Sequence, residues 1–274
     1  MTIAKNIPFK SYGILQQEMS ISILDDAVEA VRNLGYATFH SGYTTLELQS
    51  ISEEFDRTRN QYLEKYGEAN LRSVSEFNTV RSLLTQGGDV FLKLALNENL
   101  LSIIRKLIPG KFILNQQNGI VNPVGQIYEQ SAWHRDLPYQ HFVSTKPLAI
   151  NALFCVDDFT YENGATFVLP ASHKSEAFPS MNFIERNAIQ IAAKSGSFIL
   201  LDCMVFHAGG FNNTSSARRA VNHVFNIPYF KQQINIPMNM DRANISVEAL
   251  DILGFNYVEP TSVLDYFSKR IPKK

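Results

Sequence analysis

The sequence predicts a mainly β protein with flanking helices, in which the strands form a sandwich or barrel. Beyond Pro109-Gly110, short runs rich in β-branched and aromatic residues follow one another without long helices between them, which favours a sandwich or barrel over a parallel α/β sheet. Before that point, apolar residues recur at three- and four-residue spacing, as in amphipathic helices. A chain of 274 residues with 45% hydrophobic residues can bury one substantial core.

The N-terminal part, residues 1 to about 110, is expected to be helical. Residues 23–33 carry apolar side chains on one helical face, and a second helix is expected over 45–66, capped by Thr44 or Thr45. A third helix is expected over 89–107, between a Gly-Gly and a Pro-Gly pair, with a break near the polar run 97–99 that would divide it in two.

The β core is expected over residues 111–230, with Pro, Gly, Asn and Asp between the strands. A C-terminal helical extension is expected over 237–274, with helical patterns near 247–253 and 262–267. We find no internal repeat, low-complexity segment or linker, so residues 1–274 are interpreted as one domain. The expected strands are 112–121, 126–134, 148–157, 166–169, 197–201 and 220–230.

Charge and composition argue against several classes of protein. The net charge is −1 and the sequence pI is about 6.6, so no basic surface suggests nucleic acid as a partner. Cys155 and Cys203 lie in apolar runs without a C-x-x-C pair, and we interpret them as buried free thiols. The N-terminus lacks the apolar core of a signal peptide and no 18-residue apolar run exists, so a cytoplasmic protein without a membrane segment is expected.

The residues most informative about chemistry are His134, Asp136 and the more distant His207. Side chains two residues apart on a strand point the same way, so His134 and Asp136 can bind one ion together while His207 completes the set. Two histidines and a carboxylate on one face of a metal are the ligands of non-haem Fe(II) oxygenases. The alternatives are a solvent-facing polar pair for His134 and Asp136, and a core histidine satisfied by a backbone carbonyl for His207.

Arg218, eleven residues after His207, begins a strongly apolar strand. Burial of an arginine there is costly unless its charge is paired, so a bound carboxylate is a natural partner, such as one end of a small dicarboxylate co-substrate. The alternative is an exposed arginine at the start of the strand. Because side chains alternate, only one of Arg218 and Arg219 can face inward.

Taken in order, these motifs resemble the phytanoyl-CoA dioxygenase family, whose members are Fe(II)- and 2-oxoglutarate-dependent oxygenases. The resemblance covers roughly residues 113–229 and implies a double-stranded β-helix core, also described as a jelly roll or cupin-like fold. The motifs that carry it are Trp133-His134-Arg135-Asp136, Asn163-Gly164-Ala165-Thr166, Leu169-Pro170-Ala171-Ser172-His173-Lys174, and His207-Ala208-Gly209-Gly210 with Asn212 and Arg218.

The resemblance implies that His134, Asp136 and His207 bind the iron and that Arg218 binds the far carboxylate of 2-oxoglutarate. Gln117 and Asn118, on the preceding strand, are candidates for steadying the co-substrate, although alternation allows only one of them to point inward. Many members of the family place a serine or threonine two residues after the distal histidine. Here that residue is Gly209, so another group must supply any such hydroxyl contact. His173, in a turn-like Pro-x-Ser-His setting, is not expected to be a fourth ligand.

The activity implied is hydroxylation of a C–H bond with Fe(II), 2-oxoglutarate and O2, releasing succinate and CO2. Halogenating relatives replace the carboxylate ligand with a small residue, whereas this chain retains Asp136. Substrate contacts are expected from Arg135, Tyr139, Gln140, Asn151 and also His141. Ordinary polarity at the rim of a pocket is the alternative. These side chains favour a small polar substrate over a long acyl chain, and the sequence does not indicate an oligomeric state.

Three other functions are considered. A jelly-roll protein could bind a metal or ligand without catalysis, but the intact set of metal-ligand candidates with Arg218 argues against this. A metal-dependent hydrolase could use two histidines and a carboxylate, with water as the fourth zinc ligand, but it would have no use for Arg218. Within the oxygenases, the outcome could be desaturation, epimerisation or ring closure in place of hydroxylation.

Overall fold

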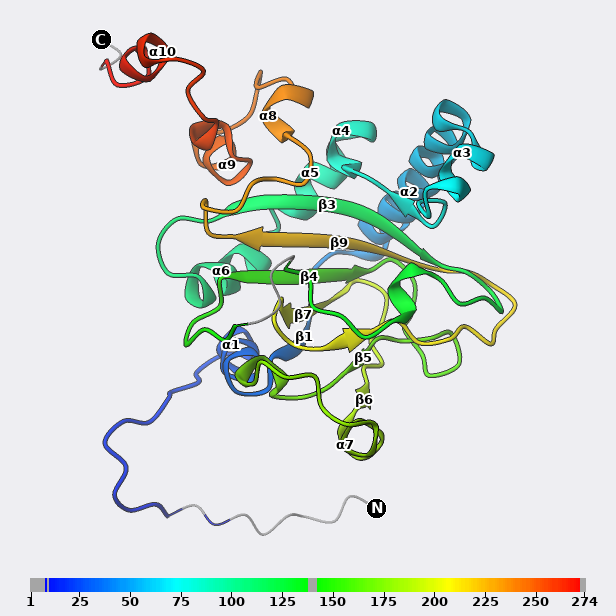
Figure 1. Cartoon of the computed structure of the whole chain (residues 1–274), viewed down its shortest axis with the longest axis vertical. Helices are drawn as coiled ribbons and strands as arrows, with labels where there is room; N and C mark the ends of the chain where they lie inside the picture. Colours follow the sequence, from blue (N-terminus) through cyan, green and yellow to red (C-terminus); the bar gives the residue numbers. More distant parts are fainter. Residues whose placement is uncertain (1–7, 9, 138–141, 272–274) are drawn as a thin grey trace.

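Two antiparallel sheets face each other in the computed structural model, which describes residue 8 and residues 10–137 and 142–271. The larger sheet has six strands in the order β1-β7-β4-β9-β3-β2, and the smaller has three in the order β6-β5-β8 (Figure 1). A single bridge between His134 and His207 continues the small sheet beyond β8. The strands are β1 Tyr36–His40, β2 Thr79–Val80, β3 Ile113–Asn122, β4 Ala149–Cys155, β5 Phe167–Val168, β6 Ile189–Gln190, β7 Ser197–Asp202, β8 His207–Ala208 and β9 Arg218–Asn226.

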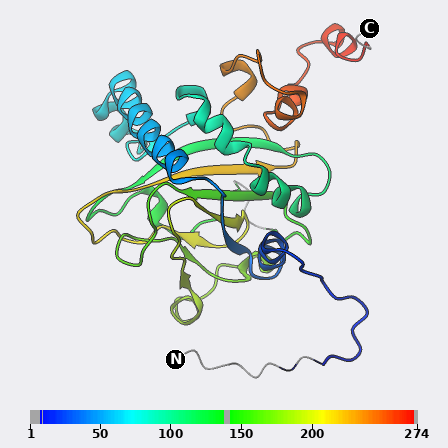
Figure 2. The same cartoon turned by 180° about the vertical axis from the view of Figure 1, so that it is seen from behind.

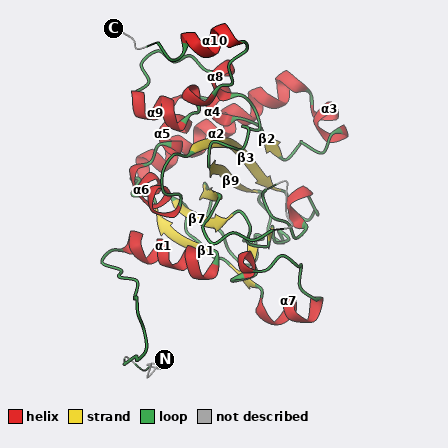
Figure 3. Cartoon of the chain, turned by 60° about the vertical axis from the view of Figure 1, so that its left-hand side comes forward, coloured by secondary structure: helices red, strands yellow, loops and turns green. Residues whose placement is uncertain are grey.

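Helices cover the outer face of the larger sheet. Seen from behind, the long α2 and the shorter α5 and α6 cross in front of its strands, whereas α7 lies beyond the small sheet at the opposite end of the molecule (Figures 2 and 3). The α-helices are α1 Ile23–Leu34, α2 Thr45–Tyr66, α3 Glu68–Ser73, α4 Leu83–Gln86, α5 Asp89–Ala95, α6 Glu98–Leu107, α7 Met181–Asn187, α8 Ile236–Asn239, α9 Val247–Ile252 and α10 Val263–Ser268. Short 3-10 helices occupy Glu129–Ser131, Ser172–Lys174 and Phe255–Tyr257.

Helix boundaries follow from local capping chemistry. Thr44 caps α2 through a capping box, in which its hydroxyl accepts from the Glu47 amide while the Glu47 carboxylate accepts from the Thr44 amide. The break expected near residues 97–99 separates α5 from α6, because the Asn97 side chain accepts from the Leu100 amide 3.0 Å away and starts a new helix. The helix predictions for 23–33, 45–66 and 89–107 are therefore confirmed.

One strand prediction is wrong and several short elements were not expected. Residues 126–134 contain the 3-10 helix Glu129–Ser131 in place of a continuous strand, and only His134 keeps a bridge to the sheet. The edge strand β1 was not expected. It forms by pairing with β7, which lies more than 150 residues later in the chain. Short strands are decided by such distant pairing rather than by their own propensity, and so leave a weak signal in the sequence.

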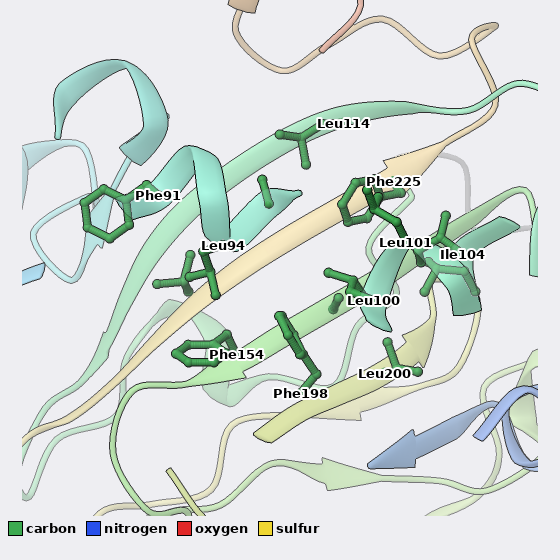
Figure 4. Close-up of a cluster of buried hydrophobic side chains, with 14 of the residues drawn as sticks. Phe91, Leu94, Leu100, Leu101, Ile104, Leu114, Phe154, Phe198, Leu200 and Phe225 are labelled. Atoms are coloured by element: carbon green, nitrogen blue, oxygen red, sulfur yellow. The ribbon is translucent and has the colours of Figure 1, made fainter. Parts of the chain in front are cut away.

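The larger sheet separates two apolar regions. On its helix-covered face, Leu94 and Leu100 pack towards Phe154, Phe198 and Phe225 of the strands (Figure 4). Between the two sheets lies a smaller cluster that includes Ile199, Leu201 and Ala220 of the large sheet and Val168 of the small one. This inner space also contains the polar side chains described below.

Cys155 and Cys203 are both buried and unpaired, as expected, and burial raises the pKa of each thiol. Within the described ranges, no helix is long and apolar enough to cross a membrane.

Candidate metal centre

His134, Asp136 and His207 converge between the two sheets. One ligand atom from each residue lies within 4.8 Å of the others. The Asp136 Oδ1 atom is 3.5 Å from His207 Nε2 and 3.8 Å from His134 Nε2. Two imidazole nitrogens and one carboxylate oxygen at such separations can bind a single transition-metal ion on one face. Elsewhere in the described chain, no group of three or more His, Cys, Asp or Glu side chains meets the same criterion.

Backbone pairing brings the two histidines together. The His134 amide donates to the His207 carbonyl at 3.0 Å, and the His207 amide donates to the His134 carbonyl at 3.1 Å. Each ring is then oriented by its own neighbourhood: Nδ1 of His134 lies 2.7 Å from the Ala132 carbonyl, and Nδ1 of His207 lies 3.1 Å from the Val205 carbonyl. Because a carbonyl can only accept, Nδ1 carries the hydrogen in both rings, which directs the Nε2 lone pair to the centre.

The carboxylate of Asp136 is held by its own set of contacts. Its backbone amide donates to the Cys203 carbonyl at 3.0 Å, and its Oδ2 accepts from Nδ2 of Asn151 at 2.7 Å. Oδ1 is thereby left to face the two histidines. Burial would raise the pKa of Asp136, but the nearby His207 and His134 lower it to about 2, so the carboxylate is ionised at neutral pH. An ionised carboxylate is the form that binds a metal.

The two histidines differ in their electrostatics. Burial, together with the charge of His207, lowers the pKa of His134. For His207, burial acts in the same direction but is outweighed by the charge of Asp136, so its pKa is raised. A metal ion would take the place of the proton that His207 otherwise shares with Asp136, since a histidine binds metal only in its neutral form.

Arg218 is buried in the same space without a carboxylate partner. Its Nε donates to the Asn163 carbonyl at 3.3 Å, one terminal nitrogen donates to the Gly164 carbonyl at 3.1 Å, and the guanidinium stacks on the Phe159 ring. The Asn163–Gly164 turn depends on glycine, because Gly164 has a φ of +75° and a Cβ there would lie 2.2 Å from the Gly210 carbonyl oxygen. Among the described residues, no Asp or Glu side chain forms an ion pair with Arg218, so its charge remains available to an anion.

Arg219 provides the contrast that side-chain alternation predicts. It points to the helix-covered side, where its guanidinium pairs with Asp157 and Asp56 at 2.7 Å each. Arg218 is therefore the inward arginine of the pair, and the expectation that only one of the two faces inward is confirmed.

A cavity joins these groups. The cavity is narrow, with about 50 Å³ open to the centres of water-sized molecules. Sequence reasoning identified some of its lining residues and missed others. Alternation along β9 from Arg218 would have found Asn222, whereas Tyr128, Gln130 and Thr166 left no periodic signal. The polar lining side chains are Tyr128, Gln130, His134, Asp136, Asn151, Thr166, His207, Arg218 and Asn222.

The two candidates for steadying the co-substrate do not line this cavity. Gln117 points to the helix side, where its amide nitrogen donates to the Phe91 carbonyl at 2.7 Å and lies 2.9 Å from Nε2 of His223. Asn118 shares the face of its register partner Asn222, but its side chain bonds instead to the Ser82 amide and to Gln233. The expectation for Gln117 is wrong, because the helices cover the face on which it lies. The Asn118 side chain is held by Ser82 and Gln233 and does not line the cavity either.

The residues expected to contact the substrate do not all line the cavity. Asn151 lines the cavity, although its Nδ2 donates to Asp136. Among the residues that the structure describes, Arg135 is not part of the cavity lining: it donates to the carbonyls of Ser172, Ser175 and Glu176 and stacks on Phe206. It points away because it alternates with His134 and Asp136. The expectations for Tyr139, Gln140 and His141 fall on residues outside those that the structure describes.

His173 lies apart from the three donors. Its Nε2 is 3.2 Å from the Arg32 carbonyl, beneath the C-terminal end of α1. The 3-10 helix Ser172–Lys174 holds it there, and it does not belong to the His-Asp-His group. This agrees with the expectation that it is not a fourth ligand.

Comparison with protein families gives one match over most of the chain. The phytanoyl-CoA dioxygenase (PhyH) family profile matches residues 31–220. An uncharacterized protein of Mycobacterium tuberculosis, Rv1501, is 30% identical over 217 residues, which cover 77% of this chain and 78% of the relative. A shorter match, 36% identical over 94 residues, covers 32% of this chain and 25% of the dioxygenase sphC of Aspergillus fumigatus.

Solved structures with the same architecture include oxygenases. EctD from S. alaskensis with bound Fe has a TM-score of 0.62 at 19% identity, covering 79% of each chain. HygX from Streptomyces hygroscopicus, solved with nickel, 2-oxoglutarate and hygromycin B, has a TM-score of 0.57 at 16% identity, covering 76% of this chain and 88% of HygX. SnoK, a non-haem α-ketoglutarate-dependent carbocyclase from nogalamycin biosynthesis, has a TM-score of 0.58 at 17% identity, covering 74% and 83%. These likenesses confirm the double-stranded β-helix fold.

Proposed function

This chain belongs to the phytanoyl-CoA dioxygenase family and is a 2-oxoglutarate-dependent non-haem iron oxygenase, and on that premise we propose that it hydroxylates a C–H bond of a small polar molecule. We assign the iron to His134, Asp136 and His207, and the distal carboxylate of 2-oxoglutarate to Arg218. The observation that supports the assignment is that three side chains able to hold a metal ion and a buried arginine without an ion-pair partner among the described residues line one cavity.

The donor set fits Fe(II). Two neutral imidazoles and one carboxylate would hold Fe(II) from one side and would leave it free to bind a chelating co-substrate and O2. The carbonyls of Ala132 and Val205 fix both histidine rings with Nε2 towards the centre, and Asn151 holds Oδ2 of Asp136 so that Oδ1 is presented to the metal. Such outer contacts raise ligand basicity and fix ligand geometry before the metal arrives.

Arg218 fits a dicarboxylate. Arg218 is 3% exposed, and its guanidinium donates to the carbonyls of Asn163 and Gly164 and bonds to the Tyr128 hydroxyl, so none of these partners carries a negative charge. A carboxylate would supply the missing negative charge and accept a two-pronged hydrogen bond. The cost of burying an unpaired guanidinium is then offset by the ligand, which favours a dicarboxylate over a simple keto acid.

When bound, Fe(II) would activate O2, the oxidant: one oxygen atom enters succinate as 2-oxoglutarate loses CO2, and the other is available to hydroxylate the substrate. The protein orients the two reactants and shields them from water within the space between its sheets. Asp136 fills the position that would otherwise be open to a halide, which is why we propose hydroxylation. Product mass separates hydroxylation from the other outcomes, since hydroxylation adds one oxygen atom, desaturation and ring closure each remove two hydrogen atoms, and epimerisation leaves the mass unchanged.

A small polar substrate is supported by the lining of the cavity. The Asn151 amide must turn its nitrogen to the Asp136 carboxylate, so its Oδ1 faces away from Asp136, and this buried oxygen has no hydrogen-bond partner among the described residues. Gln130 and Thr166 line the same cavity. A substrate hydroxyl or amine that donates to Asn151 would satisfy a group that is costly to leave unpaired. EctD, solved with 2-oxoglutarate and 5-hydroxyectoine, and HygX, solved with hygromycin B, support a small molecule as the substrate.

The decisive experiment is an anaerobic titration of the metal-free protein with Fe(II) and 2-oxoglutarate, followed by the visible metal-to-ligand charge-transfer band. The parent protein is expected to give the band, and His207→Ala is expected to abolish it. Arg218→Ala is expected to weaken 2-oxoglutarate binding by about 100-fold, because it removes one partner of a buried charge pair.

Arg219→Ala is the matched control. It removes the same side chain from the next residue, where the guanidinium pairs with Asp157 and Asp56, and 2-oxoglutarate affinity is expected to stay at the parent value. Absence of the band from the folded parent protein, with Zn(II) bound in preference, would instead favour a hydrolase.

A further inference from the structure

Position 209, two residues after the distal histidine, requires glycine because another side chain approaches it closely, and not because of its backbone conformation. Its φ is outside the left-handed region, so a residue with a side chain could adopt the same conformation. A Cβ built there, however, would lie 2.5 Å from the hydroxyl oxygen of Tyr128 and 3.1 Å from its Cζ. The Tyr128 hydroxyl therefore occupies the space that a side chain at position 209 would fill.

The backbone around Tyr128 holds this hydroxyl in position. Tyr128 precedes the 3-10 helix Glu129–Ser131, its amide donates to the Ser131 hydroxyl at 3.2 Å, and its carbonyl accepts from the Ser131 amide at 2.9 Å. The turn is joined to the strand segment, because the Gly209 amide donates to the Gln130 carbonyl at 2.7 Å. Tyr128 is 8% exposed, so its side chain is buried where it lines the cavity.

The Tyr128 hydroxyl also lies beside Arg218. Both side chains line the cavity that contains the three metal-ligand candidates. Burial raises the pKa of the phenol, and the Arg218 guanidinium opposes this rise by its charge and by a side-chain hydrogen bond. The phenol is protonated at neutral pH, so it can donate a hydrogen bond to an anion that also meets Arg218.

We propose that Tyr128 and Arg218 together bind the distal carboxylate of 2-oxoglutarate, and that Gly209 is small because the Tyr128 hydroxyl takes its place. This inference rests on the proposed function and adds a binding residue that no motif in the sequence identified. The guanidinium supplies charge and two donors in a plane, and the phenol supplies a third donor from the side of the turn. Tyr128 would thus provide the hydroxyl contact that Gly209 lacks.

The test compares two keto acids of equal length in Tyr128→Phe. 2-Oxoglutarate and 2-oxopentanoate share the chelating keto-acid end, but only 2-oxoglutarate has the distal carboxylate. In anaerobic titrations with Fe(II), Tyr128→Phe is expected to weaken 2-oxoglutarate about 10-fold, the size expected for one hydrogen bond to a charged group, and to leave 2-oxopentanoate unchanged. Tyr43→Phe is the matched control, because it removes a hydroxyl that bonds to the Lys93 carbonyl in the helical layer, and it is expected to change neither affinity.

Each other outcome has a distinct meaning. Equal weakening of both keto acids would show that Tyr128 acts only on the shape of the site, and unchanged affinity for both would show that the hydroxyl makes no contact. Either result overturns this inference while the parent titration still supports the proposed function. A parent protein that binds Fe(II) without any response to 2-oxoglutarate would overturn the proposed function itself.

A pair of exchange variants tests the shared space. Gly209→Ser alone is expected to weaken 2-oxoglutarate binding, because its Cβ would meet the Tyr128 hydroxyl. The double variant Tyr128→Ala with Gly209→Ser is expected to bind 2-oxoglutarate more tightly than Tyr128→Ala, because the serine restores a hydroxyl in the vacated space. If the double variant binds no better than Tyr128→Ala, the two side chains do not share one role.

Discussion

The two faces of strand β9 differ in how their polar groups are satisfied. On the helix-covered face, both ring nitrogens of His223 have partners, Ala152 and Gln117, and the neighbouring Val221 and Phe225 are completely buried. On the cavity face, Arg218 is equally buried but meets no carboxylate among the described residues. The same strand therefore packs into the hydrophobic core on one side, and on the other side it carries a charged group that is available to a ligand. Substitutions on the first face should change stability, and those on the second should change ligand binding.

The largest effect is expected for His134→Ala on the cavity side. Removal of one proposed iron ligand should weaken Fe(II) binding by more than about 100-fold, beyond the 10- to 100-fold that the loss of an outer contact costs, and should abolish 2-oxoglutarate turnover. The free energy of unfolding of the metal-free protein should change by less than about 1 kcal/mol, because His134 is partly exposed. Iron titration and urea unfolding on one preparation measure both quantities. Strong destabilisation would contradict the view that the cavity side serves binding and not stability.

Phe225→Ala should do the opposite. Phe225 is fully buried against the helical layer, and its truncation should lower the free energy of unfolding by about 3–5 kcal/mol. In urea unfolding, the midpoint should fall while the slope stays constant. Fe(II) and 2-oxoglutarate affinity should persist in the folded fraction at low temperature, and a selective loss of either affinity would show that the two faces are not independent.

The buried His223 should make stability depend on pH. Burial lowers its pKa to about 4 from the ordinary value of 6.5, so between these values the unfolded chain binds a proton that the folded protein excludes. The stability from this residue is complete above pH 6.5 and decreases as the pH falls towards 4, by up to about 3 kcal/mol.

His223→Leu isolates this contribution. The parent and the variant share all other titrating groups, including Asp202, whose pKa burial raises to about 6 and which acts in the opposite direction over the same range. The difference in unfolding free energy between the two proteins should therefore shift with acidification in favour of the variant. Parallel curves for parent and variant would contradict the assignment of a neutral His223.

Asn151→Ala should have the smallest effect. Asn151 contacts the proposed ligand Asp136 and not the metal, so its loss should reduce Fe(II) affinity about 10-fold, at the low end for an outer contact. Asn222→Ala is the matched control, because Asn222 lines the same cavity but accepts from Gln116. A competition titration with a chromogenic chelator measures the Fe(II) affinity of both variants. Equal losses of affinity would mean that the general polarity of the cavity matters, and not the hydrogen bond from Asn151 to Asp136.

Local patterns in the sequence predicted much of the fold. The helix over 45–66 and the break near 97–99 follow from capping side chains within a few residues of each boundary. The apolar and aromatic residues of region 126–134 resemble a strand, whereas the turn after Tyr128 is joined to Gly209, far along the chain, by the hydrogen bond from the Gly209 amide to the Gln130 carbonyl. Distant contacts of this kind leave no periodic trace.

The sequence by itself determined the chemistry of this protein: the identities and order of His134, Asp136, His207 and Arg218 pointed to one metal and one carboxylate. Alternation also required that Arg218 and Arg219 point to opposite sides. Only the tertiary structure decided which side is covered by helices and which faces the cavity, and so removed Gln117 and Arg135 from the site. The physical reason is that a period of two fixes relative direction along a strand, while burial depends on the elements that pack against each face.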